Sequence, residues 1–194
     1  MKVSIAVVFP VLLLVAPYLC ASPVHLYGGR FDLLIPAEPC ETKGKMEDAK
    51  IYISDHYILQ NLDVAITITH SSVFDLQIFL KSPTQTRICL NMYNVDEYFE
   101  GRDYIQTIFD DEAAIAIEQA QPPFTGRFRP LRPYELSCFH GEQVFGWWQL
   151  QVYDFWPSNA GKLTSFELMI ATPEPAPFIF LIAAAGISMF LRLS

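Results

Sequence analysis

Charged residues are scarce in this chain of 194 residues, and basic residues are the scarcer kind. Only 18% of the residues are charged, against about 25% in an average soluble domain. Between residues 23 and 172 there are 11 Lys and Arg against 20 Asp and Glu, a net charge of −9. Because such a surface repels phosphate, we expect no nucleic-acid partner.

Signatures of metal sites and of nucleophilic catalysis are also missing. The chain has no CxxC pair and no paired Cys/His spacing of the kind that binds zinc. It has no GxSxG turn to present a nucleophilic serine, and no motif frames a histidine as its base. The four histidines are scattered, at positions 25, 56, 70 and 140. We therefore expect no catalytic residues.

Long hydrophobic runs are confined to the two ends of the chain. Of the 52% hydrophobic residues, residues 1–22 contribute 17 of 22 and residues 173–194 contribute 14 of 22. The stretch 23–172 is 46% hydrophobic and has no apolar run of about 20 residues, which excludes a multi-pass membrane protein. It is too apolar and aromatic for a disordered chain, and its length suits one domain with a core.

Residues 1–22 have the layout of a secretory signal peptide. Lys2 precedes an apolar run from Val3 to Val15, and small residues follow up to Ser22. A retained anchor is the alternative, against which Pro10, Pro17 and the short apolar run argue. The sequence therefore predicts an exported protein.

Residues 173–194 resemble a PEP-CTERM sorting tail. Pro173, Glu174 and Pro175 precede an apolar stretch of 14 residues from Phe178 to Leu191, which is short for a bilayer about 30 Å thick. A single Arg192 stands where such tails usually carry several arginines. The resemblance implies transient anchoring in a membrane and recognition of the Pro-Glu-Pro motif by exosortase-type sorting machinery. A plain tail anchor is the alternative.

Three cysteines remain after removal of the predicted signal: Cys40, Cys89 and Cys138. Export places them in an oxidising compartment, where disulfides persist. Since three is odd, at most one intramolecular disulfide forms, and its pairing stays open.

The central stretch is dominated by alternation of apolar and polar residues. It occurs at 62–69, 75–81, 146–154 and 164–170, and turn residues separate these segments. One short helix is predicted at 110–120, where acidic residues suit a helix N-terminus. Many short strands with at most one short helix predict an all-β sandwich or jelly roll over residues 49–172. Residues 23–48 are predicted to be an N-terminal extension with one short strand and a loop.

Five sequence blocks follow one another within roughly residues 50–171: Thr69-His70 with Asp75–Thr86, then 107–113, 123–130, 136–141, and 146–154 with 159–163. In this order they resemble the P domain, also called Homo B, that follows the catalytic domain of kexin-like and subtilisin-like proteases. The chain departs from the family pattern at Gln85, Cys138, Phe166 and in the loop 91–103. The resemblance implies a jelly-roll β-sandwich of the galactose-binding-like type, which stabilises a protease domain and is not itself the hydrolase.

Acidic residues offer a calcium hypothesis. Asp96, Glu97 and Glu100 share a loop, and calcium prefers six to eight oxygen ligands gathered from neighbouring loops. The alternative is that these carboxylates cap turns or are solvated. The calcium candidates are Asp75, Asp103, Asp110, Asp111 and Glu112.

Aromatic residues near the last two strands offer a second binding hypothesis. Trp148 alternates with Leu150 and is assigned to the core. Trp147, Phe155 and Trp156 are candidates for an exposed surface that stacks on sugar rings, with a core role as the alternative.

The sequence as a whole predicts an exported, surface-sorted, stand-alone P-domain protein. Its expected role is structural or interactive, in the cell envelope or extracellular matrix, with a protease or a polysaccharide as partner. One alternative is an accessory or remnant of a subtilisin-like serine endopeptidase. Another is a calcium-dependent carbohydrate-binding module.

Overall fold

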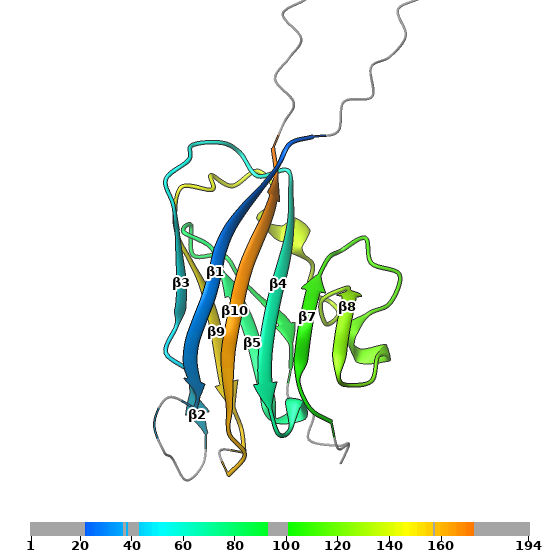
Figure 1. Cartoon of the computed structure of the whole chain (residues 1–194). Helices are drawn as coiled ribbons and strands as arrows, with labels where there is room; N and C mark the ends of the chain where they lie inside the picture. Colours follow the sequence, from blue (N-terminus) through cyan, green and yellow to red (C-terminus); the bar gives the residue numbers. More distant parts are fainter. Residues whose placement is uncertain (1–21, 37, 39–42, 93–100, 157, 173–194) are drawn as a thin grey trace, which may run out of the picture.

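The computed structural model describes residues 22–36, 38, 43–92, 101–156 and 158–172. Most of the predicted signal peptide, all of the predicted sorting tail with its Pro-Glu-Pro motif, and Asp96, Glu97 and Glu100 lie outside these residues. The described chain forms two five-stranded sheets (Figure 1). Within it, no helix is long and apolar enough to span a bilayer.

The first sheet has the strand order β1-β10-β4-β7-β8. All its neighbours are antiparallel except β7 and β8, which run parallel. Its strands are β1 (Val24–Ile35), β10 (Gly161–Ala171), β4 (Asn61–His70), β7 (Tyr104–Phe109) and β8 (Phe124–Phe128).

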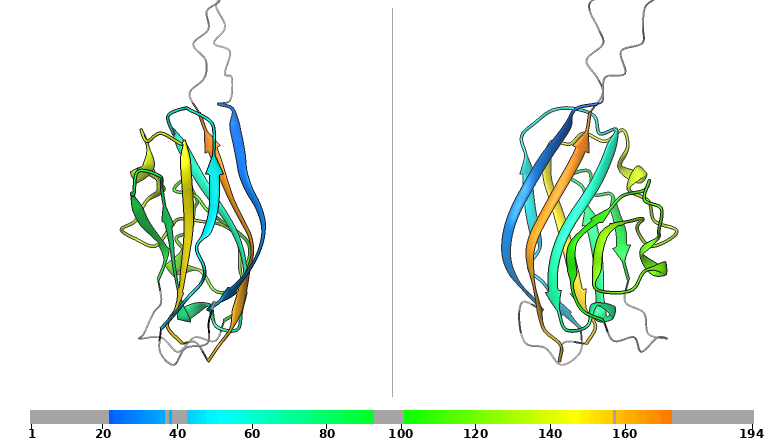
Figure 2. Two further views of the ribbon diagram at one scale, coloured as in Figure 1. Left: turned by 90° about the vertical axis from the view of Figure 1, so that its left-hand side faces the viewer. Right: turned by 45° about the vertical axis from the view of Figure 1, so that its right-hand side comes forward.

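The second sheet is entirely antiparallel and has the order β2-β9-β5-β6, with β3 also paired to β9. Figure 2 shows the two sheets packed face to face. The strands of the second sheet are β2 (Gly44–Lys45), β3 (Ala49–Ile53), β5 (Leu76–Lys81), β6 (Arg87–Asn91) and β9 (Gly146–Asp154).

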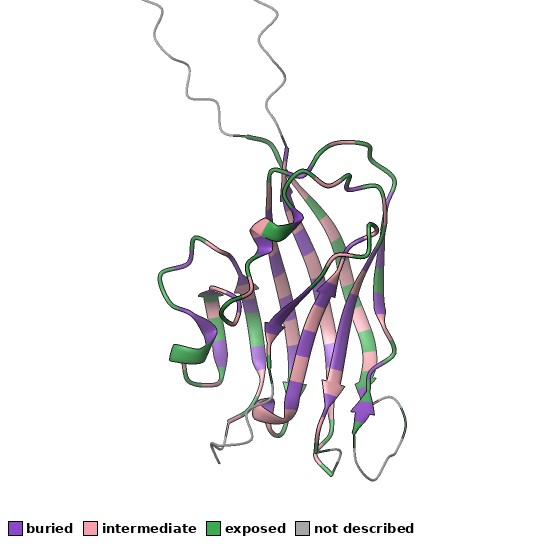
Figure 3. Ribbon diagram, turned by 180° about the vertical axis from the view of Figure 1, so that it is seen from behind, coloured by how far each residue is buried: buried purple, intermediate pink, exposed green. Residues whose placement is uncertain are grey.

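The core lies between the sheets and follows from the alternation in the sequence. Along β4, Leu62, Val64, Ile66 and Ile68 are buried, and the residues between them are partly exposed. The same pattern appears in Figure 3 as alternating buried stripes along strands such as β5 and β10. Because one face of each sheet is covered by the other, every second residue is apolar. The predicted all-β sandwich is confirmed.

Strand β1 is longer than the single short strand predicted within residues 23–48. It extends over 12 residues and pairs with β10 along its length. The Gly28-Gly29 pair interrupts its apolar pattern. Gly28 has φ +122°, and a Cβ there would lie 2.2 Å from the Phe166 carbonyl oxygen. Glycine is therefore required where β1 passes close to β10. Because glycine has no side chain, the alternation of apolar and polar residues is interrupted there, and the sequence pattern does not predict the full strand.

The helix predicted at 110–120 is reduced to one 3-10 turn, η2 (Ile117–Gln119). Ala116 forms a parallel bridge with Arg129, and the Ile117 N–H donates to the Arg129 carbonyl oxygen at 3.0 Å. Pairing of Ala116 and Ile117 with Arg129 thus interrupts the segment, which forms turns and one 3-10 turn in place of a helix. Two other 3-10 turns occur in the described chain, η1 (Val73–Asp75) and η3 (Leu136–Phe139).

Both ends of the described chain leave the sandwich at the same end. Val24 pairs with Ala171, and the Thr172 N–H donates to the Pro23 carbonyl oxygen at 3.3 Å. Figure 1 shows the start of β1 and the end of β10 side by side at this end, which we call the terminal pole. The loops 54–60 and 141–145 belong to it, because the Leu59 N–H donates to the Glu142 carbonyl oxygen and the Gln60 N–H to that of Ala171.

Candidate functional site

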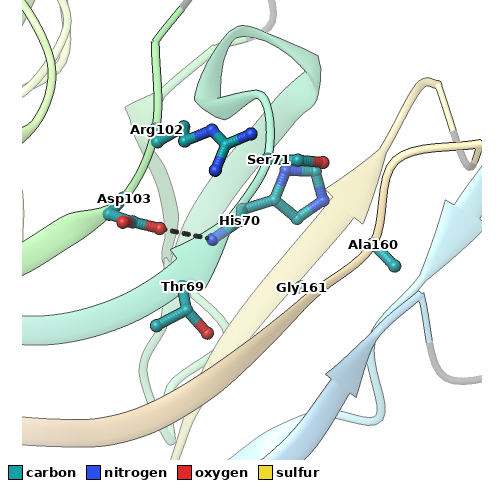
Figure 4. Close-up of a pocket in the computed structure, with 7 residues that line it drawn as sticks. All are labelled: Thr69, His70, Ser71, Arg102, Asp103, Ala160 and Gly161. Atoms are coloured by element: carbon teal, nitrogen blue, oxygen red, sulfur yellow. Dashed lines mark hydrogen bonds between the residues drawn. The ribbon is translucent and has the colours of Figure 1, made fainter.

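A pocket opens at the end of the sandwich opposite the terminal pole, where β4 ends and β7 begins. It encloses about 230 Å³, less than the roughly 300–1,000 Å³ of typical small-molecule sites. Thr69, His70 and Ser71 come from the end of β4 (Figure 4). Arg102, Asp103, Ala160 and Gly161 complete the lining.

His70 is buried behind this pocket, and its ring nitrogens face inward. Its Nδ1 lies 2.7 Å from the Ser72 carbonyl oxygen and 3.2 Å from the Ser72 backbone nitrogen. Its Nε2 lies 3.4 Å from Oδ2 of Asp154, and both side chains are fully buried. That distance is longer than a typical hydrogen bond, so the contact is a loose pairing of two buried titratable groups. The imidazole faces structural partners in the interior.

Asp103 and Asp154 accept hydrogen bonds from backbone N–H groups near this histidine. Asp103 Oδ1 accepts a 2.8 Å hydrogen bond from the His70 backbone N–H, as Figure 4 shows. Asp154 Oδ1 accepts one of 2.8 Å from the Trp156 backbone N–H. These carboxylates thus connect the ends of β4 and β9 to neighbouring loops.

Asp75 lies at the same end of the molecule and links two of its segments. Its Oδ2 accepts a 2.6 Å hydrogen bond from the Asn159 side-chain amide, and its carbonyl oxygen accepts the Phe155 N–H at 2.8 Å. The start of β5 and the β9–β10 loop are held together by these bonds.

Asp110 lies in an ionic network beyond the other end of β7. Arg127 Nη1 donates to Asp63 Oδ2 and to Asp110 Oδ2, both at 2.7 Å. Burial raises the pKa of Asp63, and the bond from Arg127 opposes that rise. The same two carboxylates raise the pKa of Arg127. Asp110 Oδ1 also accepts the Glu112 N–H at 2.8 Å, which closes a tight turn.

The five calcium candidates do not come together. β7 separates Asp103 from Asp110 by about 20 Å, given the rise of a strand. Among the residues that the structure describes, no three His, Cys, Asp or Glu side chains form a group that could hold a metal. Four of the five candidates accept hydrogen bonds from backbone N–H groups or from Asn159 and Arg127 side chains. Calcium binding stays a prediction.

Asp111 holds the start of η3 from a loop 25 residues earlier. Its two carboxylate oxygens accept the Leu136 N–H at 2.8 Å and the Ser137 N–H at 2.7 Å. Replacing Asp111 by alanine leaves both donors without this acceptor. We expect the change to lower the free energy of unfolding by about 1–3 kcal/mol, measured by thermal denaturation.

Glu112→Ala serves as the matched control, because Glu112 is exposed next to Asp111. It is expected to change stability by less than about 0.5 kcal/mol. Both melts are repeated with calcium and with a chelator. Equal stability of D111A and E112A would contradict the anchoring role, and a calcium-dependent rise that D111A abolishes would assign Asp111 to a metal site.

The predicted aromatic candidates divide between opposite ends of β9. Trp147 is exposed at its start, whereas Phe155, half-buried, and Trp156, exposed, follow its end. A strand of this length separates them by about 25–30 Å, so they form no single surface. Lys43 Nζ lies 4.3 Å from the centre of the Phe155 ring.

Trp147 has aromatic neighbours that sequence reasoning missed. Its ring centre lies 5.0 Å from that of Tyr52, which lies 5.8 Å from Phe145, and Phe145 stacks on His56 at 4.2 Å. We call these four residues the aromatic collar. Tyr52 faces outward beside Trp147 because the two are register partners in β3 and β9. Alternation of apolar and polar residues in 49–53 indicates that Tyr52 faces outward. Its position beside Trp147 depends on the pairing of β3 with β9, which is a long-range contact that the local pattern does not contain.

Two of these three cysteines, Cys89 and Cys138, are described, and they form no disulfide with each other. Cys89 is buried, which raises the pKa of its thiol to about 12, whereas Cys138 is exposed. Since Cys40 lies outside the described residues, the pairing stays open.

Comparison with known proteins links the chain to one family. A model of the proprotein convertase P-domain matches residues 59–170. No curated protein matches the chain. Among solved structures, the serine protease of Aeromonas sobria aligns with 79% of this chain at 20% identity and a TM-score of 0.45. The same protease in complex with the chaperone ORF2 aligns at 18% identity with the same coverage and TM-score. The chain covers 28% of those proteins.

Proposed function

The chain belongs to the proprotein convertase P-domain family, and from this premise we propose that it is an exported, surface-sorted, non-catalytic interaction module. Its place is the cell envelope or extracellular matrix, reached through the predicted signal at 1–22. Exosortase-type machinery acts on the tail at 173–194, which anchors the protein transiently in the membrane. Its role is to bind, or to help build, a surface structure.

The environment of His70 is the observation that carries the non-catalytic role. A general base must reach the proton that it removes from a nucleophile in contact with substrate. The His70 side chain is fully buried, and its two nitrogens face the Ser72 backbone and Asp154. Ser71 is exposed beside it, but the imidazole is buried, with Nδ1 against the Ser72 backbone and Nε2 3.4 Å from Asp154 Oδ2. At the pocket of the described chain, Ser71, His70 and Asp103 lie together. The geometry of His70 supports a structural role for this group.

An accessory of a separate serine endopeptidase is the second candidate. The match to a domain named for proprotein convertases favours it. In that case the partner is a protease, and the chain stabilises it by contact. Affinity capture from the exported protein fraction separates the candidates: a co-purifying subtilisin-like protease supports the accessory role, and envelope polysaccharide supports the surface module.

The non-catalytic role is tested with purified chain and casein as a general substrate. We expect no hydrolysis above that of buffer, because His70, the histidine at the pocket, is fully buried. Ser71→Ala is the informative variant, since Ser71 is exposed and its loss should leave folding intact. Hydrolysis by the wild type that S71A abolishes would overturn the proposal. Hydrolysis that S71A retains would point to a contaminating protease, which further purification removes if the proposal holds.

A further inference from the structure

The terminal pole gathers exposed apolar side chains. Of eleven large hydrophobic residues that are exposed in the described chain, six lie around this pole. Monomeric proteins expose single apolar residues without consequence, but a concentration of them at one end indicates a contact surface. The six are Val24, Leu26, Tyr52, Ile58, Phe145 and Trp147.

The aromatic collar supplies the larger part of this surface. Trp147 is 52% exposed, Tyr52 49% and Phe145 41%, although their rings pack against one another. Trp and Tyr combine an apolar body with a polar tip, which suits the boundary between water and lipid headgroups. Val24 and Leu26, on the outer face of β1, extend the apolar surface around the pole.

A short tether limits where the terminal pole can be. Only five residues, 173–177, separate Thr172 from the apolar stretch that starts at Phe178. The six peptide steps from Thr172 to Phe178 span at most about 20 Å when fully extended. Because Val24 lies beside Ala171, the N-terminal side of the domain is at the same place. When residues 178–191 occupy a bilayer, the pole therefore lies within about 20 Å of its surface.

We propose that the terminal pole docks on the membrane interface, with the aromatic collar at the level of the lipid headgroups. This inference rests on the proposed function, since it requires the tail to be in the membrane. The net charge of −9 over residues 23–172 disfavours attraction to anionic lipid, so docking depends on apolar contact. The same rings could stack on sugars, but the tether brings lipid to them first.

Tryptophan quenching in reconstituted vesicles tests the docking, because the three tryptophans occupy different positions. Trp147 is at the terminal pole, Trp148 is buried, and Trp156 is exposed at the opposite end. The full chain is reconstituted in phosphatidylcholine vesicles with brominated acyl chains, as the variants W156F and W147F. We expect at least about a twofold larger loss of emission in W156F, since only it keeps an interfacial tryptophan.

Flotation of the same vesicles separates this inference from the proposed function. Chain that floats with stronger quenching in W156F supports docking. Chain that floats with equal quenching in both variants overturns docking and leaves the membrane tail standing. Chain that does not float overturns the membrane tail. A soluble neutral glucan that shifts the emission of W156F, where brominated lipid does not, overturns docking in favour of a glycan site. Matching thermal melts of both variants confirm that they are folded.

Discussion

Replacing Trp148 by alanine is expected to lower the free energy of unfolding by about 3–5 kcal/mol, because it leaves a large cavity in the core. Trp148 is fully buried between the sheets, with its ring 5.4 Å from Phe139. Its indole N–H donates to the Val144 carbonyl oxygen at 2.9 Å, so the change also removes the partner of a buried acceptor. Thermal denaturation of the full chain should show a fall in Tm of roughly 6–20 °C for a domain of this size.

The neighbouring Trp147 provides a control of identical chemistry. It is the residue before Trp148 in β9 but faces outward. Trp147→Ala is expected to cost less than about 1 kcal/mol, since exposed positions tolerate truncation. Trp148→Phe fills part of the cavity, so its loss of unfolding free energy should lie between those of W147A and W148A. Equal melting of W147A and W148A would show that the register of β9 is wrong.

Replacing Asp154 by alanine is expected to destabilise the fold by about 1–3 kcal/mol, because it removes the acceptor of the Trp156 N–H and the buried carboxylate that faces His70. Asp154 Oδ2 faces Nε2 of the buried His70, and Oδ1 accepts the Trp156 N–H. The change therefore removes one hydrogen bond, from the Trp156 N–H, together with the carboxylate oxygen that faces the imidazole. Chemical denaturation by urea, monitored by circular dichroism, gives the free energy directly.

Asp32→Ala is the matched control for this second change. Asp32 is also paired, with Lys162 Nζ at 2.6 Å, but its side chain is 79% exposed. Solvent screens such pairs, so the loss should be between 0 and about 1 kcal/mol. If D154A and D32A proved equally stable, the buried pair would make no net contribution.

Strand prediction succeeded where one face of a strand is buried and the other is not. Period-2 alternation at 62–69 and 146–154 predicts β4 and β9 and places Trp148 in the core. It failed for β1, where Gly28 is required by close approach to Phe166. The helix prediction at 110–120 was also wrong, because pairing of Ala116 with Arg129 overrides the local helical preference.

The candidate sites were less predictable than the strands, since each depends on contacts between distant residues. Asp103 and Asp110 are close in sequence, but a strand places them at opposite ends of β7. The partner of Asp111 lies 25 residues away at Leu136. Trp147 was a candidate from the sequence, whereas Tyr52 became its neighbour only through the pairing of β3 with β9.

The sequence by itself determined the composition of the domain, its alternating strands, its family and the two apolar ends. These follow from local patterns, because burial of one face dictates every second residue of a strand. Only the tertiary structure decided that β1 closes the first sheet and that Val24 lies beside Ala171. It also placed the aromatic collar at the end of the sandwich where β1 begins and β10 ends. Register and sheet order arise from pairings across the whole chain, which no local pattern contains.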